Sequence, residues 1–147
     1  MRGMFVFGAL FVAVGCNSDR VRVHPVRGKV TFEGKPMPWG GSMALVPLSN
    51  QPGKAAGGEI MSDGSYHLST YTDGDGSMAG DFRVVITQVT HKEPERTADG
   101  VAPSRTAPML PASEQIPMIY ADSQKSPLTA KIEAKNPNEL NFDLKRK

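Results

Sequence analysis

Residues 26–33, Val-Arg-Gly-Lys-Val-Thr-Phe-Glu, alternate between apolar or small side chains and polar ones. Val26, Gly28, Val30 and Phe32 therefore share one face of an extended chain, and the charged and hydroxyl side chains share the other. This period of two is typical of a half-buried β-strand. The Gly-Lys-Pro sequence that follows turns the chain and ends the strand, because proline has no N–H to donate to a ladder.

Six later stretches show the same alternation, or a short apolar run between turn residues. These predicted strands cover residues 42–48, 57–62, 65–71, 80–89, 128–133 and 140–145. Asp63-Gly64 predicts a type I′ hairpin turn, because both residues tolerate positive φ. Asn136-Pro137-Asn138 predicts a turn that joins the last two strands as a hairpin. Helical periodicity is absent after residue 16.

Seven short strands with Gly- and Pro-rich connections predict an all-β fold, a seven- or eight-stranded antiparallel β-sandwich. The chain has 15 Gly and 12 Pro in 147 residues, which suits strands and turns better than helices. Each large side chain that is buried contributes about 1.5–3 kcal/mol. The side chains predicted to face the core are Val26, Val30, Phe32, Leu45, Ile60, Tyr66, Leu68, Phe82, Val84, Ile86, Leu128, Ile132, Leu140, Phe142 and Leu144.

The N-terminus carries the longest apolar run of the sequence. Met1-Arg2 supplies one positive charge, residues 3–15 carry none, and polar residues begin at Asn17. A basic start, an apolar stretch and small residues at its end are typical of a secretory signal. The run is shorter than the about 20 apolar residues of a transmembrane helix. We therefore expect a signal peptide at 1–15, a tether at 16–25 and a β-sandwich domain at 26–147.

Ala13-Val14-Gly15-Cys16 resembles the lipobox of bacterial lipoproteins, in which a diacylglycerol joins the cysteine thiol and cleavage leaves that cysteine first. By this resemblance, cleavage falls between Gly15 and Cys16, and Cys16 is lipidated, with palmitate-type chains. The protein is then exported and held by its lipid anchor on a bacterial membrane, in the periplasm or at the cell surface. Cys16 is the only cysteine, so disulfides cannot stabilise the domain. The closest alternative is an ordinary signal peptide that releases a soluble protein.

Residues 25–37 resemble the opening of small planctomycete-type lipoproteins that carry a carboxypeptidase regulatory-like, transthyretin-like (prealbumin-like) domain. Later stretches fit the same pattern, among them Val46-Pro47, residues 62–66, residues 74–84 and residues 116–128. The resemblance implies a transthyretin-like or Ig-like sandwich of seven or eight strands, exported and lipid-anchored in the cell envelope. It supplies no substrate and no cofactor.

Catalytic and metal-binding patterns are weak. One transthyretin-like hydrolase relies on histidines, an arginine and a C-terminal Tyr-Arg-Gly-Ser, but this chain ends Leu-Lys-Arg-Lys, and its histidines, at 24, 67 and 91, lack metal-ligand spacing. Asp73, Asp75 and Asp81 fail the EF-hand template, because Met78 and Val84 occupy its Gly and Glu positions. A looser oxygen site there stays open. We expect no enzyme activity, no bound metal and no cofactor.

Two features favour binding. Trp39, in Pro-Trp-Gly-Gly, suits either a stacking contact with a carbohydrate or a cover over one end of the core. Residues 90–125 form a long connection with five prolines, and such connections are usually functional or disordered. Residues 116–120 are apolar enough to dock on the domain.

The sequence therefore predicts a non-enzymatic interaction or structural module of the envelope, with an unidentified protein or glycan partner. The alternative is a lipoprotein that binds a small ligand or carbohydrate through Trp39 and the 90–125 loop. A nucleic-acid partner is not expected, because the formal net charge is only +2.

Overall fold

The computed structural model describes residues 20–92 and 108–146. Gly15 and Cys16 lie outside these ranges, as does much of the first half of the predicted 90–125 loop. Within them the chain is all-β, which confirms the predicted fold class. Ten strands and two 3₁₀ helices are defined in this part of the chain: β1 (Val23–His24), β2 (Val26–Phe32), β3 (Lys35–Pro36), β4 (Gly41–Pro47), β5 (Gly57–Ile60), β6 (Ser65–His67), β7 (Ser77–Met78), β8 (Gly80–Gln88), η1 (Ala112–Glu114), η2 (Met118–Ala121), β9 (Thr129–Ile132) and β10 (Asn138–Leu144).

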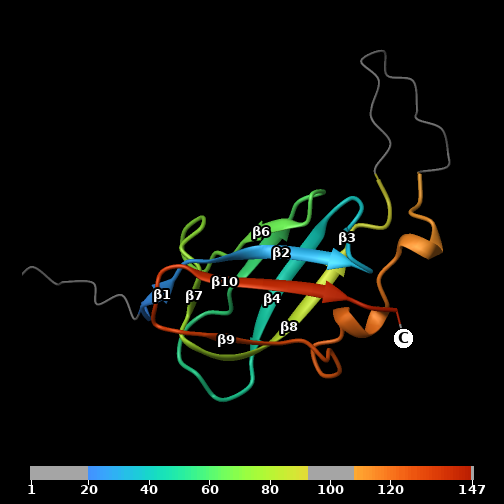
Figure 1. The fold of residues 1–147 in the computed structure, drawn as a ribbon. Coiled ribbons are helices and arrows are strands. Elements are labelled where there is room, and N and C mark those ends of the chain that lie inside the picture. Colours follow the sequence, from blue (N-terminus) through green and yellow to red (C-terminus); the bar gives the residue numbers. More distant parts are fainter. Residues whose placement is uncertain (1–19, 93–107, 147) are drawn as a thin grey trace, which may run out of the picture.

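Eight of these strands form one curled sheet in the order β10-β2-β6-β5-β4-β8-β9, with β3 paired to β2. The sheet bends where β5 meets β6, since their ladder consists of the single pair Ile60 and Tyr66. Figure 1 shows the result as two layers, in which β2 and β10 cross over β4 and β8. Pairing is antiparallel except between β10 and β2, which run parallel.

The predicted hairpin between the last two strands is wrong. β9 pairs with β8 and β10 pairs with β2, so the two strands lie at opposite ends of the sheet order. Asn138, which is 2% exposed, explains how the chain passes from β9 to β10. Its side chain bonds both the N–H and the C=O of Glu133, and its own N–H donates to the carbonyl of Pro25, 2.8 Å away. These bonds direct the chain from one layer to the other.

The core is the one that the alternation predicts. Twelve of the fifteen predicted side chains are buried in a single cluster, and Leu128, Leu140 and Phe142 are partly buried against it. Six buried members of the cluster were not among the predicted side chains, namely Met37, Met43, Ala56, Met78, Tyr120 and Ala130. Tyr120 belongs to the predicted docking stretch 116–120, and its hydroxyl donates to the carbonyl of Lys145, 3.0 Å away.

The Asp63-Gly64 turn is not type I′, because Gly64 has φ of 81° whereas Asp63 is not in the left-handed region. The N–H of Gly64 donates to Met61 O, and the N–H of Met61 donates to Ser65 O, as in a type I turn followed by a bulge. The Asp63 carboxylate accepts bonds from the N–H and hydroxyl of Ser65, which lower its pKa.

The type I′ geometry occurs instead between β2 and β3, where Glu33 has φ of 52° and Gly34 has φ of 77°. A residue of β10 stabilises this hairpin through side-chain hydrogen bonds. The carboxylate of Asp143 accepts the N–H of Gly34 and the hydroxyl of Thr31, each at 2.9 Å.

The end of the predicted tether is part of the domain. β1 pairs antiparallel with β7, and the N–H of Val21 donates to the Tyr71 hydroxyl at 3.1 Å. His24 is buried, with its Nδ1 3.4 Å from Asn136 Oδ1. Residues 20–25 are therefore fixed at one end of the sandwich (Figure 1).

Candidate functional site

The end of the sandwich opposite β1 gathers the features that suggest binding. β8 starts beside β7 and runs to Gln88, and its nine residues span about 30 Å. At its far end, Gln88 is paired with Gly41, and the carbonyl of Gly40 accepts the N–H of Val89. The loop that carries Trp39 therefore lies at the end away from β1.

Trp39 occupies an unusual backbone conformation. Its φ is 61°, and that of Gly40 is 66°. A side chain at Gly40 is excluded, since a Cβ there would lie 2.1 Å from the carbonyl oxygen of Ile60. Left-handed φ is rare for a bulky residue and tends to occur at functional sites. The loop is fixed by Met37, which is fully buried beneath it.

The indole of Trp39 is half-buried and lies outside the described core cluster. The Lys92 ammonium lies 5.2 Å from the ring centroid, in cation–π contact. Trp39 thus presents an aromatic ring beside a positive charge at the surface. Trp39 was predicted from sequence as a contact residue, whereas Lys92 was not.

Gln88 joins three segments at this end. Its side-chain N–H groups donate to the carbonyls of Pro38 and Glu114, at 3.3 and 3.0 Å, and its Oε1 accepts the N–H of Ile116 at 2.8 Å. Gln88 is 9% exposed. Gln88 was not among the residues predicted from sequence. It nevertheless continues the inward-facing series of Phe82, Val84 and Ile86, and a polar residue at such a position needs hydrogen-bond partners.

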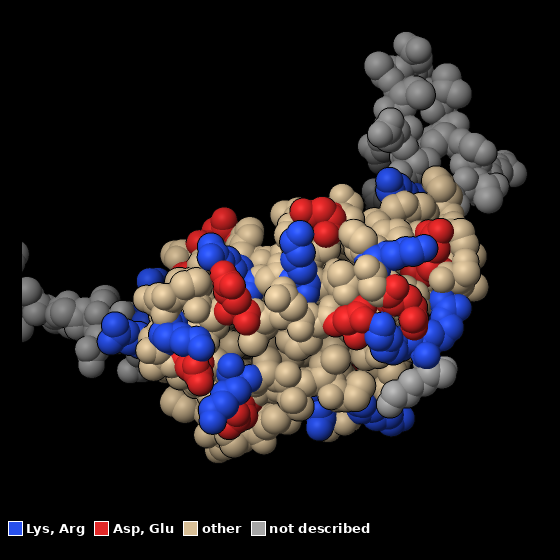
Figure 2. Space-filling view, in the orientation of Figure 1, with Lys and Arg blue, Asp and Glu red and all other residues tan. Residues whose placement is uncertain are grey.

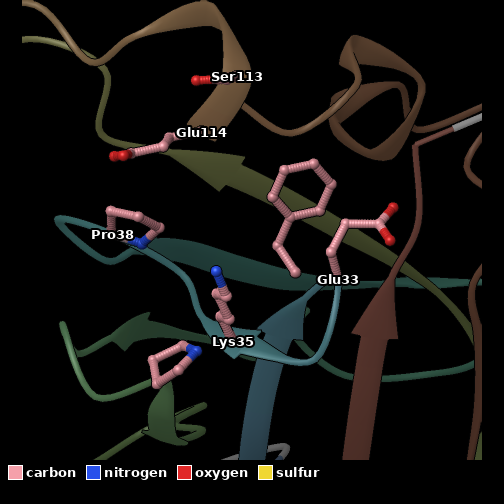
Figure 3. A pocket seen from close by; sticks show the side chains of 7 residues that line it. Glu33, Lys35, Pro38, Ser113 and Glu114 are labelled. Carbon is pink, nitrogen blue, oxygen red and sulfur yellow. The ribbon is translucent and has the colours of Figure 1, made fainter.

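A pocket of about 360 Å³ lies between the β2–β3 hairpin, the loop before β4 and η1. Phe32, Glu33, Lys35, Pro36, Pro38, Ser113 and Glu114 line it. Figure 3 shows Lys35 pointing into the space between Pro38 and Glu114, whereas the Glu33 carboxylate points away. Lys35 forms no ion pair with any described residue. The pocket therefore offers apolar walls with one ammonium group, one hydroxyl and one carboxylate.

Arg146 contacts two of the segments that line this pocket. Its guanidinium donates to the carbonyls of Ser113 and Ala112, at 2.7 and 3.2 Å, and lies 5.4 Å from the ring centroid of Phe32. Its backbone N–H donates to the carboxylate of Glu33 at 2.6 Å. These contacts join the segment after β10 to η1 and to the β2–β3 turn, and so link two walls of the pocket.

The aspartates considered for a cation are used otherwise. Partial desolvation opposes the ionisation of Asp75, but the N–H groups of Thr70, Thr72 and Tyr71 outweigh it and lower the pKa of this carboxyl. Asp73 contacts His67 and Ser69 instead.

Asp81 lies on β8, where its backbone carbonyl accepts bonds from Leu48 and Gln51. Among the residues that the structure describes, no group of three or more His, Cys, Asp or Glu side chains is arranged to hold a metal ion.

The histidines do not form a catalytic cluster in the described ranges. His67 Nε2 lies 3.0 Å from Asp73 Oδ1, and the Ser69 hydroxyl donates to the same oxygen at 3.4 Å. The carboxylate therefore lies between the hydroxyl and the imidazole, so the imidazole is not placed to deprotonate the serine as in a hydrolytic triad. His91 lies apart, with Nδ1 3.0 Å from the Thr90 hydroxyl.

Charges of both signs are mixed over the surface. On the face shown in Figure 2, Lys and Arg side chains alternate with Asp and Glu side chains, and neither sign forms a continuous patch. Cross-strand pairs account for part of this pattern, for example Arg27 with Glu139 at 2.8 Å. Specific recognition at this face therefore depends on local groups rather than on a long-range field.

Within the described ranges, the structure contains no helix with the length and apolar character needed to cross a membrane. Comparison of the chain with models of protein families, with curated proteins and with solved structures finds no match in any of the three. The resemblance to transthyretin-like lipoproteins thus stays a prediction from sequence.

Proposed function

We propose that this chain is an exported lipoprotein, anchored to a bacterial membrane through Cys16, whose sandwich is a non-enzymatic binding module. The signal-like N-terminus and its cysteine support the anchor. One structural observation supports the binding role: the chain joins the sandwich at the β1 end, whereas Trp39 and the 360 Å³ pocket lie at the other end. An anchor before β1 would leave the Trp39 end directed away from the bilayer and open to partners.

Site-specific photocrosslinking in intact cells tests this proposal. A photoreactive residue replaces Lys35, which points into the pocket, or Lys54, which is exposed in the loop beside β1. We expect a reproducible crosslinked partner from position 35 and not from position 54. Replacing Cys16 by Ala should move the protein from the membrane to the soluble fraction and weaken the crosslink. Equal crosslinking from both positions, or from neither, would contradict the binding role.

A second candidate function is the binding of a small ligand or carbohydrate by Trp39. It is supported by the half-exposed indole beside an ammonium group, an arrangement suited to stacking on a sugar ring. Because Trp39 is the sole tryptophan, its fluorescence reports on that site alone. The expected result for this function is a saturable change in this fluorescence with one member of a glycan panel. Because Trp39→Ala has no tryptophan signal, titration calorimetry with the same glycan should show that this variant no longer binds it. An unchanged spectrum across the panel would eliminate it.

A further inference from the structure

Alternate residues of β8 direct their backbone hydrogen-bonding groups toward the two opposite edges of the strand. On the β4 side, the N–H of Val89 donates to the carbonyl of Gly40 at 3.1 Å. On the same side, the carbonyl of Asp81 accepts the N–H of Leu48 at 3.0 Å. Because backbone groups alternate in direction along a strand, the odd-numbered residues of β8 face β4 and the even-numbered ones face the opposite edge.

The opposite edge is paired only in part. There the N–H of Val84 donates to Leu128 O at 2.9 Å, and the carbonyl of Thr90 accepts the N–H of Leu110 at 2.8 Å. The β9 ladder itself covers only residues 80–83 of β8. Within the part of the chain that the structure describes, no strand therefore pairs with β8 between these two bonds.

Ile86 and Gln88 are the even-numbered residues in this gap. Their backbone N–H and C=O groups make no hydrogen bond on this side with any described residue. Two donors and two acceptors therefore repeat along the edge at a spacing of about 7 Å. Such groups are costly to leave without partners, and an unpaired strand edge is a template for pairing with another chain.

The gap is a groove with an apolar wall. Its volume is about 260 Å³. Ile86, Thr87 and Gln88 form one side, and Ile116, Pro117 and Met118 form the other. The wall cannot complete the ladder, because Pro117 has no N–H and the N–H of Ile116 is bonded to the side chain of Gln88. Met118 is 82% exposed and available for contact.

We infer that this groove binds an extended peptide segment of a partner protein, which adds as a short strand to β8. The backbone of such a peptide supplies donors and acceptors at the repeat that Ile86 and Gln88 require. No charged residue lines the groove, so an uncharged segment with an apolar side chain over Met118 fits it best. This inference rests on the proposed binding role and names the class of partner.

The test uses the native protein and a display library of random linear octapeptides. Selected peptides should share an apolar position and bind with a saturable isotherm. N-methylation of alternate peptide nitrogens should weaken binding at least tenfold, and N-methylation of the intervening ones should not, because only every second N–H faces β8. Met118→Glu should weaken binding about tenfold, whereas Met109→Glu, another exposed methionine outside the groove lining, should not.

Hydrogen exchange of the Ile86 and Gln88 amides gives an independent readout. Both amides should exchange more slowly when the peptide is bound. Binding without the alternating effect of N-methylation would mean that side chains alone are recognised, and it would overturn the inference while leaving a binding module. Protection of the same amides on self-association would assign the groove to a second copy and also overturn it. If no peptide binds, the inference fails, and the crosslinking from position 35 decides the proposed function separately.

Discussion

The phenol of Tyr66 donates a hydrogen bond to the backbone carbonyl of Leu140, 2.8 Å away, and so links β6 to β10 across β2. Gly28 lies between them, paired with Tyr66 on one side and Leu140 on the other. A Cβ at Gly28 would lie 1.7 Å from the Leu140 carbonyl oxygen. The parallel pairing of β10 with β2 therefore depends on Tyr66 in β6 and on the absence of a side chain at Gly28 in β2. Burial raises the pKa of Tyr66, so this phenol stays a donor across neutral pH.

Removing this bond or filling this space should destabilise the sandwich. We expect Tyr66→Phe to lower the free energy of unfolding by about 1–2 kcal/mol, because the Leu140 carbonyl loses its donor. Gly28→Ala should cost more, about 3 kcal/mol, because backbone rather than a flexible side chain must move. Urea unfolding followed by circular dichroism measures both. Gly57→Ala is the matched control, since the nearest atom to its Cβ would be Met43 O at 3.3 Å rather than 1.7 Å, and a clearly smaller loss than in Gly28→Ala is expected there.

The strands and the core were predictable because their signal is local. Alternation along residues 26–33 and 80–89 identifies which side chains face inward, and Val30, Phe82 and Ile86 are fully buried as predicted. Pairing partners were not predictable in the same way. The alternation in the last strand is equally compatible with a hairpin to β9 and with the observed pairing to β2, since either partner buries the same face.

The candidate site was predictable only where one residue carried the signal. Trp39 is conspicuous in the sequence because it is the sole tryptophan. Its contact with Lys92 was not predictable, because Trp39 precedes β4 and Lys92 follows β8, more than fifty positions later. Arg146 and Glu33 are 113 positions apart in the sequence, so no spacing rule could pair them. Gln88 was detectable in principle as a polar residue at an inward position, but its partners in η1 and in the loop before β4 depend on tertiary structure.

Acidification should weaken the β2–β3 hairpin. The side chain of Lys145, the N–H of Gly34 and the hydroxyl of Thr31 lower the pKa of Asp143 from 3.8 to about 2. Since the pKa is lower in the folded state, the ionised carboxylate stabilises the fold above about pH 4, and this contribution is lost as the pH falls from 4 to 2. Urea midpoints measured across this range should fall less steeply in Asp143→Asn than in the parent. Lys145→Met removes the largest cause of the lowered pKa of Asp143, so the loss of stability should occur at higher pH in this variant. Identical stability profiles in all three proteins would contradict a stabilising role for the Asp143 carboxylate.

Gln88 should control the environment of Trp39. In Gln88→Met, a side chain of similar length cannot bond Pro38, Glu114 or Ile116, so three partly buried hydrogen bonds to backbone groups are lost. We expect the free energy of unfolding to fall by about 1–3 kcal/mol and the emission of Trp39 to shift to the red as its loop loosens. Gln51→Met is the control, because the amide of Gln51 bonds Asp81 O at the β1 end of β8. A spectral shift of the same size in both variants would mean that Gln88 does not act through the Trp39 loop.

Gly76 should decide whether the N-terminal segment stays fixed to the sandwich. Its φ is 89°, and a Cβ there would lie 1.8 Å from the carbonyl oxygen of His24, in β1. Gly76→Ala should therefore displace β1 from β7 and expose the backbone after Arg22, so that trypsin cleaves there several-fold faster. Gly74→Ala separates this effect from backbone strain, because Gly74 has φ of 71° but no atom closer than 3.9 Å to its Cβ. If both variants accelerate cleavage equally, strain in the loop before β7 is responsible, and the contact between Gly76 and β1 does not hold the segment in place.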